Sequence, residues 1–283
     1  MAIILDGKAQ AQLIKDRVKA ELSKNKAENK AAMAVVQVGS DPASTVYIRQ
    51  KERACAEVGI DFKKVSLPED ITMEAMLAEI DALNADPKLH GFMVQQPLPS
   101  QLNPDVIVDR IDPKKDVDCL HPYNVGLVSE GRSILAPCTP YGVISLLDAY
   151  DISLQGKHCV IVGRSRIVGK PLGMMMLAKN ATVTYCHSRT INLADICRQA
   201  DVLAVAIGQA KFISADMIKE VCVLIDVGIN RIENENAKPT LCGDVDYDSC
   251  LKKASYITPV PGGVGPMTVA VLMENSLKAW KTQ

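Results

Sequence analysis

The segment Gly163-Arg-Ser-Arg-Ile-Val-Gly169 has the residue types of a phosphate-binding turn. It follows the β-branched run 159–162 and precedes a helix-length segment, and in this setting a tight turn directs backbone N–H groups and a helix N-terminus at phosphate. Gly163 makes the turn, but Ser165 replaces the second glycine of the Gly-x-Gly-x-x-Gly fingerprint and the last glycine is displaced to Gly169. Taken alone, the turn leaves a simple strand-to-helix connection as an equal alternative.

The end of the next predicted strand indicates which nucleotide would bind. A NAD-binding unit usually places an acidic residue about 20 residues after the turn, to bind the ribose 2′-hydroxyl. This strand ends instead in Cys186-His-Ser-Arg189. Ser188, Arg189 and Arg164 offer a hydroxyl and two cations to a 2′-phosphate. A single arginine there would be an ordinary solvated residue, whereas three suitable groups near one expected site favour NADP.

The first half of the chain carries further candidates for chemistry. Tyr47 and Lys51 share a face if their segment is helical, although such a pair most often decorates a surface. Gln95 and Gln96 end a predicted buried strand, and the carboxyl ends of strands are where open α/β sheets bind ligands. The tetrad Lys115-Asp-Val-Asp118 is by default an exposed charged turn.

Short β-branched runs alternate with helix-length segments along the whole chain, which is the pattern of parallel sheets with crossover helices. The predicted fold class is α/β, with two α/β domains and a cleft between them, the second a Rossmann-type doubly wound parallel sheet. We expect helices over 8–26, 44–58, 73–83, 140–149, 169–178, 193–199, 214–218 and 267–280, and strands over 34–38, 62–66, 91–95, 159–162, 182–186, 202–206 and 223–227. Segment 97–137 is expected to be a functional loop and interdomain connection with a brief helix near 106–111. Segment 258–268 holds three glycines and three prolines, more than a simple connector requires.

The composition excludes several classes of protein. With 283 residues, 48% of them apolar and 23% charged, the chain is globular and about two domains long. Lys and Arg total 32 against 33 Asp and Glu, so nucleic acid is not an expected partner. No stretch approaches the roughly 18 apolar residues of a membrane span, so no membrane association is expected. Nine scattered cysteines without a CxxC pair indicate reduced, buried thiols in a cytoplasmic protein, with no metal site.

Together these motifs resemble the bifunctional methylenetetrahydrofolate dehydrogenase/methenyltetrahydrofolate cyclohydrolase family. The matching segments, in chain order, are 38–51, 94–99, 115–118, 137–140, 163–171, 186–190, 225–229 and 259–268. They span essentially the whole chain, without the formate-ligating domain of longer relatives. Several motifs in the right order over two domains are far more specific than any one of them.

The resemblance implies an activity and a role for four residues. The activity is NADP-dependent oxidation of 5,10-methylenetetrahydrofolate to 5,10-methenyltetrahydrofolate and hydrolysis of that product to 10-formyltetrahydrofolate, in one shared active site. Lys51 is the expected general acid and base, and Gln95 orients it. Tyr47 would stack on the aminobenzoate ring, and Asp118 would bind the pterin.

The resemblance also implies binding residues, domain limits and an assembly. Folate is expected to contact Tyr47, Lys51, Val94, Gln95, Gln96, Asp118, Pro261, Gly262, Gly263, Val264 and Gly265. NADP is expected to contact Gly163, Arg164, Ser165, Ser188 and Ile229. Residues 1–120 with 266–283 would form the folate-binding catalytic domain, and 121–265 the NADP-binding domain. A homodimer is implied as well.

One residue departs from the family pattern. The family commonly has glycine after the aspartate of the tetrad, and this chain has Cys119. A β-carbon there restricts the backbone and narrows the space beside the pterin.

Two other function classes stay open at this stage. One is an NADP-dependent oxidoreductase acting on a different small substrate, and the other is a non-catalytic nucleotide-binding or regulatory module. The second would be favoured by loss of Lys51 or Gln95, and the sequence retains both.

Overall fold

A computed structural model describes residues 2–24, 30–234 and 237–283, which divide into two compact units. The three-stranded unit comprises Gln12–Cys138 and Val269–Gln283, and the six-stranded unit comprises the chain up to Ala11 with Thr139–Thr268. The units differ from the expected domain limits at three places: the chain up to Ala11 and residues 266–268 belong with the second sheet, and residues 121–138 belong with the first.

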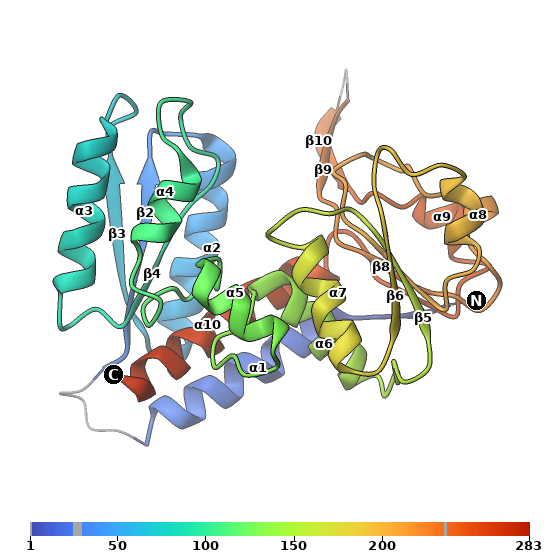
Figure 1. Cartoon of the computed structure of the whole chain (residues 1–283), viewed down its shortest axis with the longest axis horizontal. Helices are drawn as coiled ribbons and strands as arrows, with labels where there is room; N and C mark the ends of the chain where they lie inside the picture. The colour runs from blue at the N-terminus through green and yellow to red at the C-terminus, as the bar shows by residue number, and fades with distance from the viewer. Residues whose placement is uncertain (1, 25–29, 235–236) are drawn as a thin grey trace. The chain divides into compact units, whose positions relative to one another are not determined.

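The three-stranded unit is a parallel sheet of order β3-β2-β4 (Figure 1). Its strands are β2 (Ala32–Val38), β3 (Asp61–Leu67) and β4 (Gly91–Val94). Its helices are α2 (Pro42–Val58), α3 (Met73–Ala85), α4 (Pro104–Arg110) and α5 (Pro122–Ser129), together with most of α1 (Gly7–Leu22) and α10 (Val264–Thr282).

Local sequence explains where the helix that follows β2 begins and ends. Asp41 caps the N-terminus of α2, because its carboxylate accepts a hydrogen bond from the Ser44 N–H at 2.6 Å. Gly59, at φ +91°, ends the helix in the left-handed conformation that glycine adopts most readily. The helix therefore starts shortly after β2 and carries Tyr47 and, one turn later, Lys51.

The apolar residues of this unit pack on both faces of the sheet. On one face, Ala34 and Val36 of β2 lie in a buried cluster with residues of α3 and α4, among them Met76, Ile80 and Ile107. On the other face, the Ser276 hydroxyl of α10 lies 3.4 Å from the sulfur of Met33 in β2. Helices therefore cover both faces, as the continuous apolar runs of parallel strands require.

The six-stranded unit is a parallel sheet of order β1-β11-β8-β7-β5-β6. Its strands are β1 (Ile3–Ile4), β5 (His158–Val162), β6 (Thr182–Cys186), β7 (Val202–Val205), β8 (Val223–Asp226) and β11 (Tyr256–Ile257). An antiparallel hairpin is formed by β9 (Asn230–Asn234) and β10 (Ala237–Cys242). The helices are α6 (Cys138–Ala149), α7 (Gly169–Ala178), α8 (Leu193–Cys197), α9 (Tyr247–Cys250) and the 3₁₀ turn η1 (Ala215–Met217).

The strand order places a topological switch between β5 and β7. From β5 the chain first moves to β6 on one side and then returns to β7 on the other. Ligands of open α/β sheets bind at the carboxyl ends of strands at such a point. The predicted α/β class and the doubly wound second sheet are confirmed.

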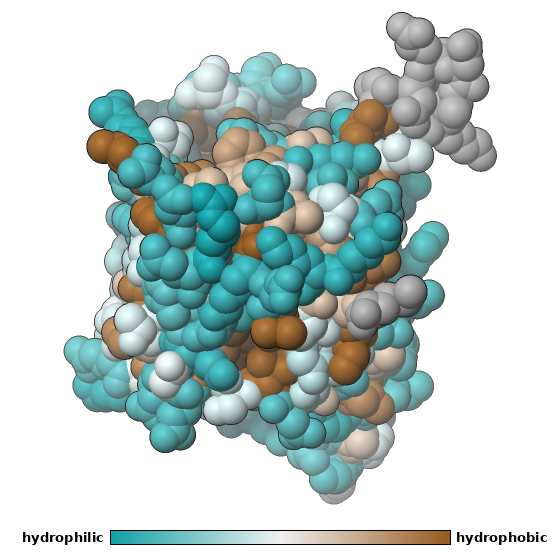
Figure 2. All heavy atoms as spheres, turned by 90° about the vertical axis from the view of Figure 1, so that its right-hand side faces the viewer, coloured by the Kyte–Doolittle hydropathy of each residue, from teal (hydrophilic) through white to brown (hydrophobic). Residues whose placement is uncertain are grey.

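The distribution of polar side chains on the surface and the burial of the cysteines are those of a folded globular protein. On the face shown in Figure 2, hydrophilic side chains predominate and hydrophobic ones occur as separate patches. None of the described helices combines the length and hydropathy that a membrane crossing needs. All nine cysteines are free, and eight of them are buried, whereas Cys242 is half-buried.

Candidate active site

Lys51 and Gln95 meet in the three-stranded unit. The Lys51 ammonium on α2 donates a hydrogen bond to Gln95 Oε1 at 2.6 Å, and the lysine is only 9% exposed. Gln95 follows β4 directly, and its own amide donates to the Gln96 carbonyl at 2.7 Å. The sheet edge after β4 therefore supplies the partner of a lysine on the neighbouring helix. Surface decoration, the default interpretation of Lys51, is wrong.

Asp118 is close enough to Lys51 for their charges to interact. Burial lowers the pKa of Lys51, and the charges of Asp118 and Cys138 oppose that shift. Burial raises the pKa of Asp118, and the Lys51 charge opposes this in turn. Part of the Asp118 residue stays accessible, but its carboxylate is desolvated. Each group thus favours the charged form of the other in a poorly solvated place.

Tyr47 lies one turn before Lys51 on α2 and is 39% exposed. Its ring is therefore accessible on the helix that carries the lysine. Val94 ends β4 as a buried residue, and Gln96 is half-buried beyond it. The structure thus gathers Lys51, Gln95 and Asp118, with Tyr47 close by in the chain.

Asn275 is a residue that sequence reasoning missed. This fully buried amide of α10 donates to the Val117 carbonyl at 2.8 Å and the Ala136 carbonyl at 2.7 Å, and accepts from the Ala136 N–H at 3.2 Å. Its nitrogen also lies 3.6 Å from the sulfur of Cys138. Asn275 thereby fixes the chain on either side of Asp118. The signal in the sequence that could have indicated its role is an amide side chain among the apolar residues of the C-terminal helix.

Two side chains of the tetrad that contains Asp118 are held in place by hydrogen bonds to neighbouring segments. Lys115 is buried, and its ammonium donates to three carbonyl groups at the end of α3. Asp116 is also buried, and its carboxylate accepts hydrogen bonds from the N–H groups of Leu120 and His121 and from the Asn124 amide. The default interpretation of this tetrad as an exposed charged turn is therefore wrong.

Cys119 adopts the backbone conformation that glycine prefers. Its φ is +58°, in the left-handed region, which agrees with the expectation that a β-carbon restricts the backbone at this position. The side chain is fully buried, and its thiol donates to the Leu135 carbonyl at 3.4 Å. The sulfur is therefore packed against the segment before α6, and burial raises its pKa.

The Gly163 turn lies in the six-stranded unit at the carboxyl end of β5. Gly163 has φ +131°, and a β-carbon on it would lie 2.3 Å from the Ala206 carbonyl oxygen after β7. The Ser165 hydroxyl accepts hydrogen bonds from the N–H groups of Val168 and Gly169, at 3.1 and 3.3 Å, and so closes the first turn of α7. Arg164 is exposed beside it. Only a residue without a side chain fits at position 163.

The end of β6 carries exposed polar groups. Ser188 and Arg189 are exposed on a tight turn in which the His187 N–H donates to the Thr190 hydroxyl at 2.8 Å. No acidic residue occurs between Cys186 and Thr190. This hydroxyl and guanidinium suit a 2′-phosphate, and the close approach at Gly163 suits a pyrophosphate, so the residues fit NADP.

The predicted folate-wall residues Pro261, Gly262, Gly263, Val264 and Gly265 belong to the six-stranded unit. Gly262, at φ +110°, accepts a hydrogen bond from the Lys8 N–H at 3.0 Å, and Gly263 is buried. Ile229 is 44% exposed, and its Cδ1 lies 3.6 Å from where a β-carbon on Gly265 would be. These residues therefore lie near Ile229, and their joint contact with folate stays a prediction.

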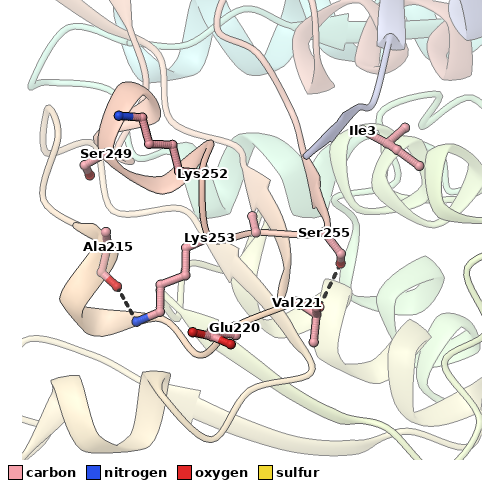
Figure 3. A pocket seen from close by; sticks show the side chains of 9 residues that line it. Ile3, Ala215, Glu220, Val221, Ser249, Lys252, Lys253 and Ser255 are labelled. Atoms are coloured by element: carbon pink, nitrogen blue, oxygen red, sulfur yellow. Dashed lines mark hydrogen bonds between the residues drawn. The ribbon is translucent and has the colours of Figure 1, made fainter. Parts of the chain in front are cut away.

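A separate hollow of about 750 Å³ lies at the amino ends of β8 and β11 (Figure 3). It is lined by Ile3, Ala215, Glu220, Val221, Ser249, Lys252, Lys253, Ala254 and Ser255. Two polar groups facing it are already engaged, because the Lys253 ammonium donates to the Ala215 carbonyl and the Ser255 hydroxyl to the Val221 carbonyl. It contains none of the predicted site residues, and we assign it no part in the site.

Two family models match the chain over both halves. Residues 5–118 match the catalytic domain of tetrahydrofolate dehydrogenase/cyclohydrolase, and residues 137–283 match its NAD(P)-binding domain. The chain belongs to the tetrahydrofolate dehydrogenase/cyclohydrolase family. A relative in this family, the bifunctional protein FolD of Agathobacter rectalis, is 51% identical over 99% of this chain and 100% of its own.

Solved structures of the family extend the comparison. The FolD methylenetetrahydrofolate dehydrogenase/cyclohydrolase of Campylobacter jejuni superposes with a TM-score of 0.96 at 45% identity, covering 100% of this chain and 99% of its own. The Trypanosoma brucei enzyme, solved with NADP cofactor and an inhibitor, superposes with a TM-score of 0.95 at 35% identity, covering 99% and 98%. The predicted family, the bifunctional dehydrogenase and cyclohydrolase activity and the cofactor NADP are confirmed.

Proposed function

We propose that Lys51, Gln95, Asp118 and Tyr47 carry the chemistry of both reactions of this bifunctional enzyme in one site. The supporting observation is the 2.6 Å hydrogen bond from a nine-tenths buried lysine to Gln95, with Asp118 acting on the same lysine. A desolvated lysine has a lowered pKa and can therefore exchange protons closer to neutrality, which requires no metal ion. In the described residues, no three His, Cys, Asp or Glu side chains are arranged to bind one.

In the oxidation, the protein's task is positioning. A hydride leaves the methylene carbon that bridges N5 and N10 of the folate, and the two nitrogens stabilise the resulting methenyl cation. NADP, when bound, accepts that hydride. Tyr47 stacks on the aminobenzoate ring, and the Asp118 carboxylate accepts hydrogen bonds from the pterin N–H groups. These contacts hold the reacting carbon in a fixed orientation.

In the hydrolysis, Lys51 moves protons. Water attacks the methenyl carbon, and the neutral amine of Lys51 takes a proton from the attacking water. The resulting ammonium then protonates N5 as the C–N5 bond breaks, which leaves the formyl group on N10. One proton is released to solvent overall. Gln95 accepts a hydrogen bond from Nζ in either protonation state and so keeps it aimed at the substrate.

The remaining predicted residues line the two ligands. We assign Val94, Gln96 and Pro261 to Gly265 to the folate, on the family resemblance. We assign Gly163, Arg164, Ser165, Ser188 and Ile229 to NADP. Support for the cofactor set comes from the space that Gly163 leaves at the β5 edge and from the exposed hydroxyl and guanidinium groups nearby.

Replacing Lys51 by methionine tests the central assignment. We expect Lys51→Met to abolish hydrolysis of methenyltetrahydrofolate, because methionine fills the space of the lysine stem but cannot exchange a proton. Loss of the methenyl absorbance gives the rate. Arg53→Met, an exposed change on the same helix, is the control and should hydrolyse normally. Near-normal hydrolysis by Lys51→Met would refute the role of Lys51.

We also propose a cytoplasmic homodimer. The dimer rests on the family resemblance, and light scattering during size-exclusion chromatography measures it directly. The cytoplasmic location is supported by nine free cysteines, which are typical of a reducing compartment. Fractionation of cells that express the chain tests the location.

A further inference from the structure

Asp226 and Asp244 are two buried carboxylates of the six-stranded unit, apart from the residues assigned to the two reactions. Asp226 is 3% exposed and Asp244 is fully buried. We propose that both are positioning residues for NADP, because together they fix the two loops that follow β7 and β8. The proposal rests on the function and the cofactor site proposed above.

Asp244 fixes the loop after β7. One carboxylate oxygen accepts hydrogen bonds from the N–H groups of Ile207 at 2.7 Å and Gly208 at 3.0 Å. The other accepts from the Gln209 N–H at 2.8 Å and the Asn230 side-chain amide at 2.9 Å. A single side chain thus takes three successive N–H groups of one loop and reaches the start of β9. Hydrogen bonds to an ionised acceptor are stronger than neutral ones.

Asp226 fixes the chain around Asp244. One of its oxygens accepts from the N–H groups of Gly228 at 3.0 Å and Asp244 at 2.9 Å, and the other accepts from the Val245 N–H at 2.9 Å. Its backbone N–H donates to the Thr258 hydroxyl at 2.7 Å. The carboxylate therefore joins the segment that enters the β9–β10 hairpin to the segment that leaves it.

Two glycines make room for the two carboxylates. A β-carbon on Gly228 would lie 2.2 Å from Oδ1 of Asp244, and one on Gly243 would lie 1.7 Å from Oδ2 of Asp226. Contacts this short are impossible for real side chains. The sequences Asp226-Val-Gly228 and Gly243-Asp244 are thus matched to each other, each aspartate filling the space that the other segment's glycine leaves.

This network lies at the edge of the sheet where the cofactor site is proposed. The loop that Asp244 fixes begins after Ala206, whose carbonyl oxygen is the atom nearest to the missing β-carbon of Gly163. Ile229, assigned to NADP, lies between Gly228 and Asn230, and both are bonded to these aspartates. The hydrogen bonds of the two carboxylates go to the protein itself. They therefore shape the loops rather than take part in the reaction.

Asp244→Asn tests the proposal, because the hydrolysis of methenyltetrahydrofolate needs no NADP and serves as an internal control. Asparagine keeps one acceptor oxygen but turns an NH₂ group toward N–H donors. We expect the KM for NADP in the oxidation to rise about tenfold or more, with kcat changed much less and cyclohydrolase activity within about twofold of the parent. Asp248→Asn, an exposed carboxylate on α9, is the matched control and should leave both unchanged.

Asn230→Ala covers the case in which Asp244→Asn fails to fold. It removes one half-buried partner of Asp244 and leaves the three backbone hydrogen bonds, so a smaller rise in the KM for NADP is expected, again with cyclohydrolase activity retained. An unchanged KM for NADP in the folded variants, or an equal loss of both activities, would overturn the proposal. Failure of the proposed function would appear separately, as near-normal hydrolysis of methenyltetrahydrofolate by Lys51→Met.

Discussion

Two opposing influences act on the pKa of Lys51, and their balance sets the pH at which our proposed base is neutral. Burial favours the neutral amine, whereas the negative charge of Asp118 favours the ammonium. Since the hydrolysis first needs the amine and then the ammonium, a pKa brought toward neutrality serves both steps. In the mechanism that we propose, Asp118 therefore has two roles: its charge adjusts the pKa of Lys51, and its carboxylate binds the pterin.

Removing the charge of Asp118 should move the pH dependence of hydrolysis. Asp118 raises the pKa of Lys51, so Asp118→Asn lowers that pKa further, and the amine becomes available at a lower pH. We expect the rising limb of cyclohydrolase activity to shift toward acid, with a higher KM for folate. The pH profile of kcat measures the shift, and Asp109→Asn, exposed on α4, should leave the profile in place. If the rising limb of the pH profile stayed in place or moved to higher pH, the proposed effect of Asp118 on the pKa of Lys51 would be wrong.

At the scale of the elements, Lys115 acts as a cap for α3. The last carbonyl groups of a helix lack partners within the helix. The Lys115 ammonium donates to the carbonyl groups of Leu83, Asn84 and Asp86, at 3.2, 2.8 and 2.7 Å. The same residue begins the tetrad that ends in Asp118, so it ties the helix end to the site.

Lys115→Met should destabilise the fold without altering the chemistry directly. Three carbonyl groups would lose a charged donor, and we expect the free energy of unfolding to fall by about 2 to 4 kcal/mol. Urea denaturation followed by circular dichroism gives the value. Lys114→Met is the matched control, since Lys114 is exposed, and it should change stability by less than about 0.5 kcal/mol. Equal effects of the two substitutions would disprove the capping role.

The regular elements were the most predictable part of the fold. The predicted bounds of α7 and β6 coincide with the structure, and those of α2, β2 and α3 lie within two residues of it. Alternation of apolar runs and helix-length segments is a local signal, which explains this success. Helix α10 begins at Val264, earlier than expected, and the expected helix 214–218 is only the 3₁₀ turn η1. The last two residues of the expected helix 8–26 lie outside the described residues.

The missed elements and contacts depend on partners distant in the sequence. β1 and β11 are two residues each and exist through their pairing, while α5, α9 and the β9–β10 hairpin occur in segments without a clear period. The pairing of Lys51 with Gln95 is predictable only through the family resemblance, because 44 residues separate the two in the sequence. The burial of Lys115 and the contacts of Asn275 could not be predicted, because they join positions far apart in the chain.

At the scale of the whole molecule, the limits of the two units fall in helices rather than in flexible linkers. The chain passes from one unit to the other between Ala11 and Gln12 within α1, after the first residue of α6, and between Thr268 and Val269 within α10. Unfolding either unit therefore removes turns from helices that the other unit also uses.

We accordingly expect one cooperative unfolding transition for the whole chain. NADP at about 100 times its Kd should raise the free energy of unfolding by about 2.7 kcal/mol and shift that transition as a single peak. Differential scanning calorimetry with and without NADP measures the effect. Two peaks, of which NADP moves only one, would show that the shared helices do not couple the units.

The burial of eight of the nine cysteines gives the folded chain a single convenient attachment point. Burial raises the pKa of thiols such as Cys55 and Cys159 to about 12, and it also raises the pKa of Cys242, so accessibility is what distinguishes Cys242 from the others. Cys242 is the cysteine with an accessible surface, and it directly precedes Gly243, the residue packed against Asp226. A maleimide fluorophore added to the native enzyme would attach at the base of the β9–β10 hairpin, where its emission could follow NADP binding without any engineered cysteine.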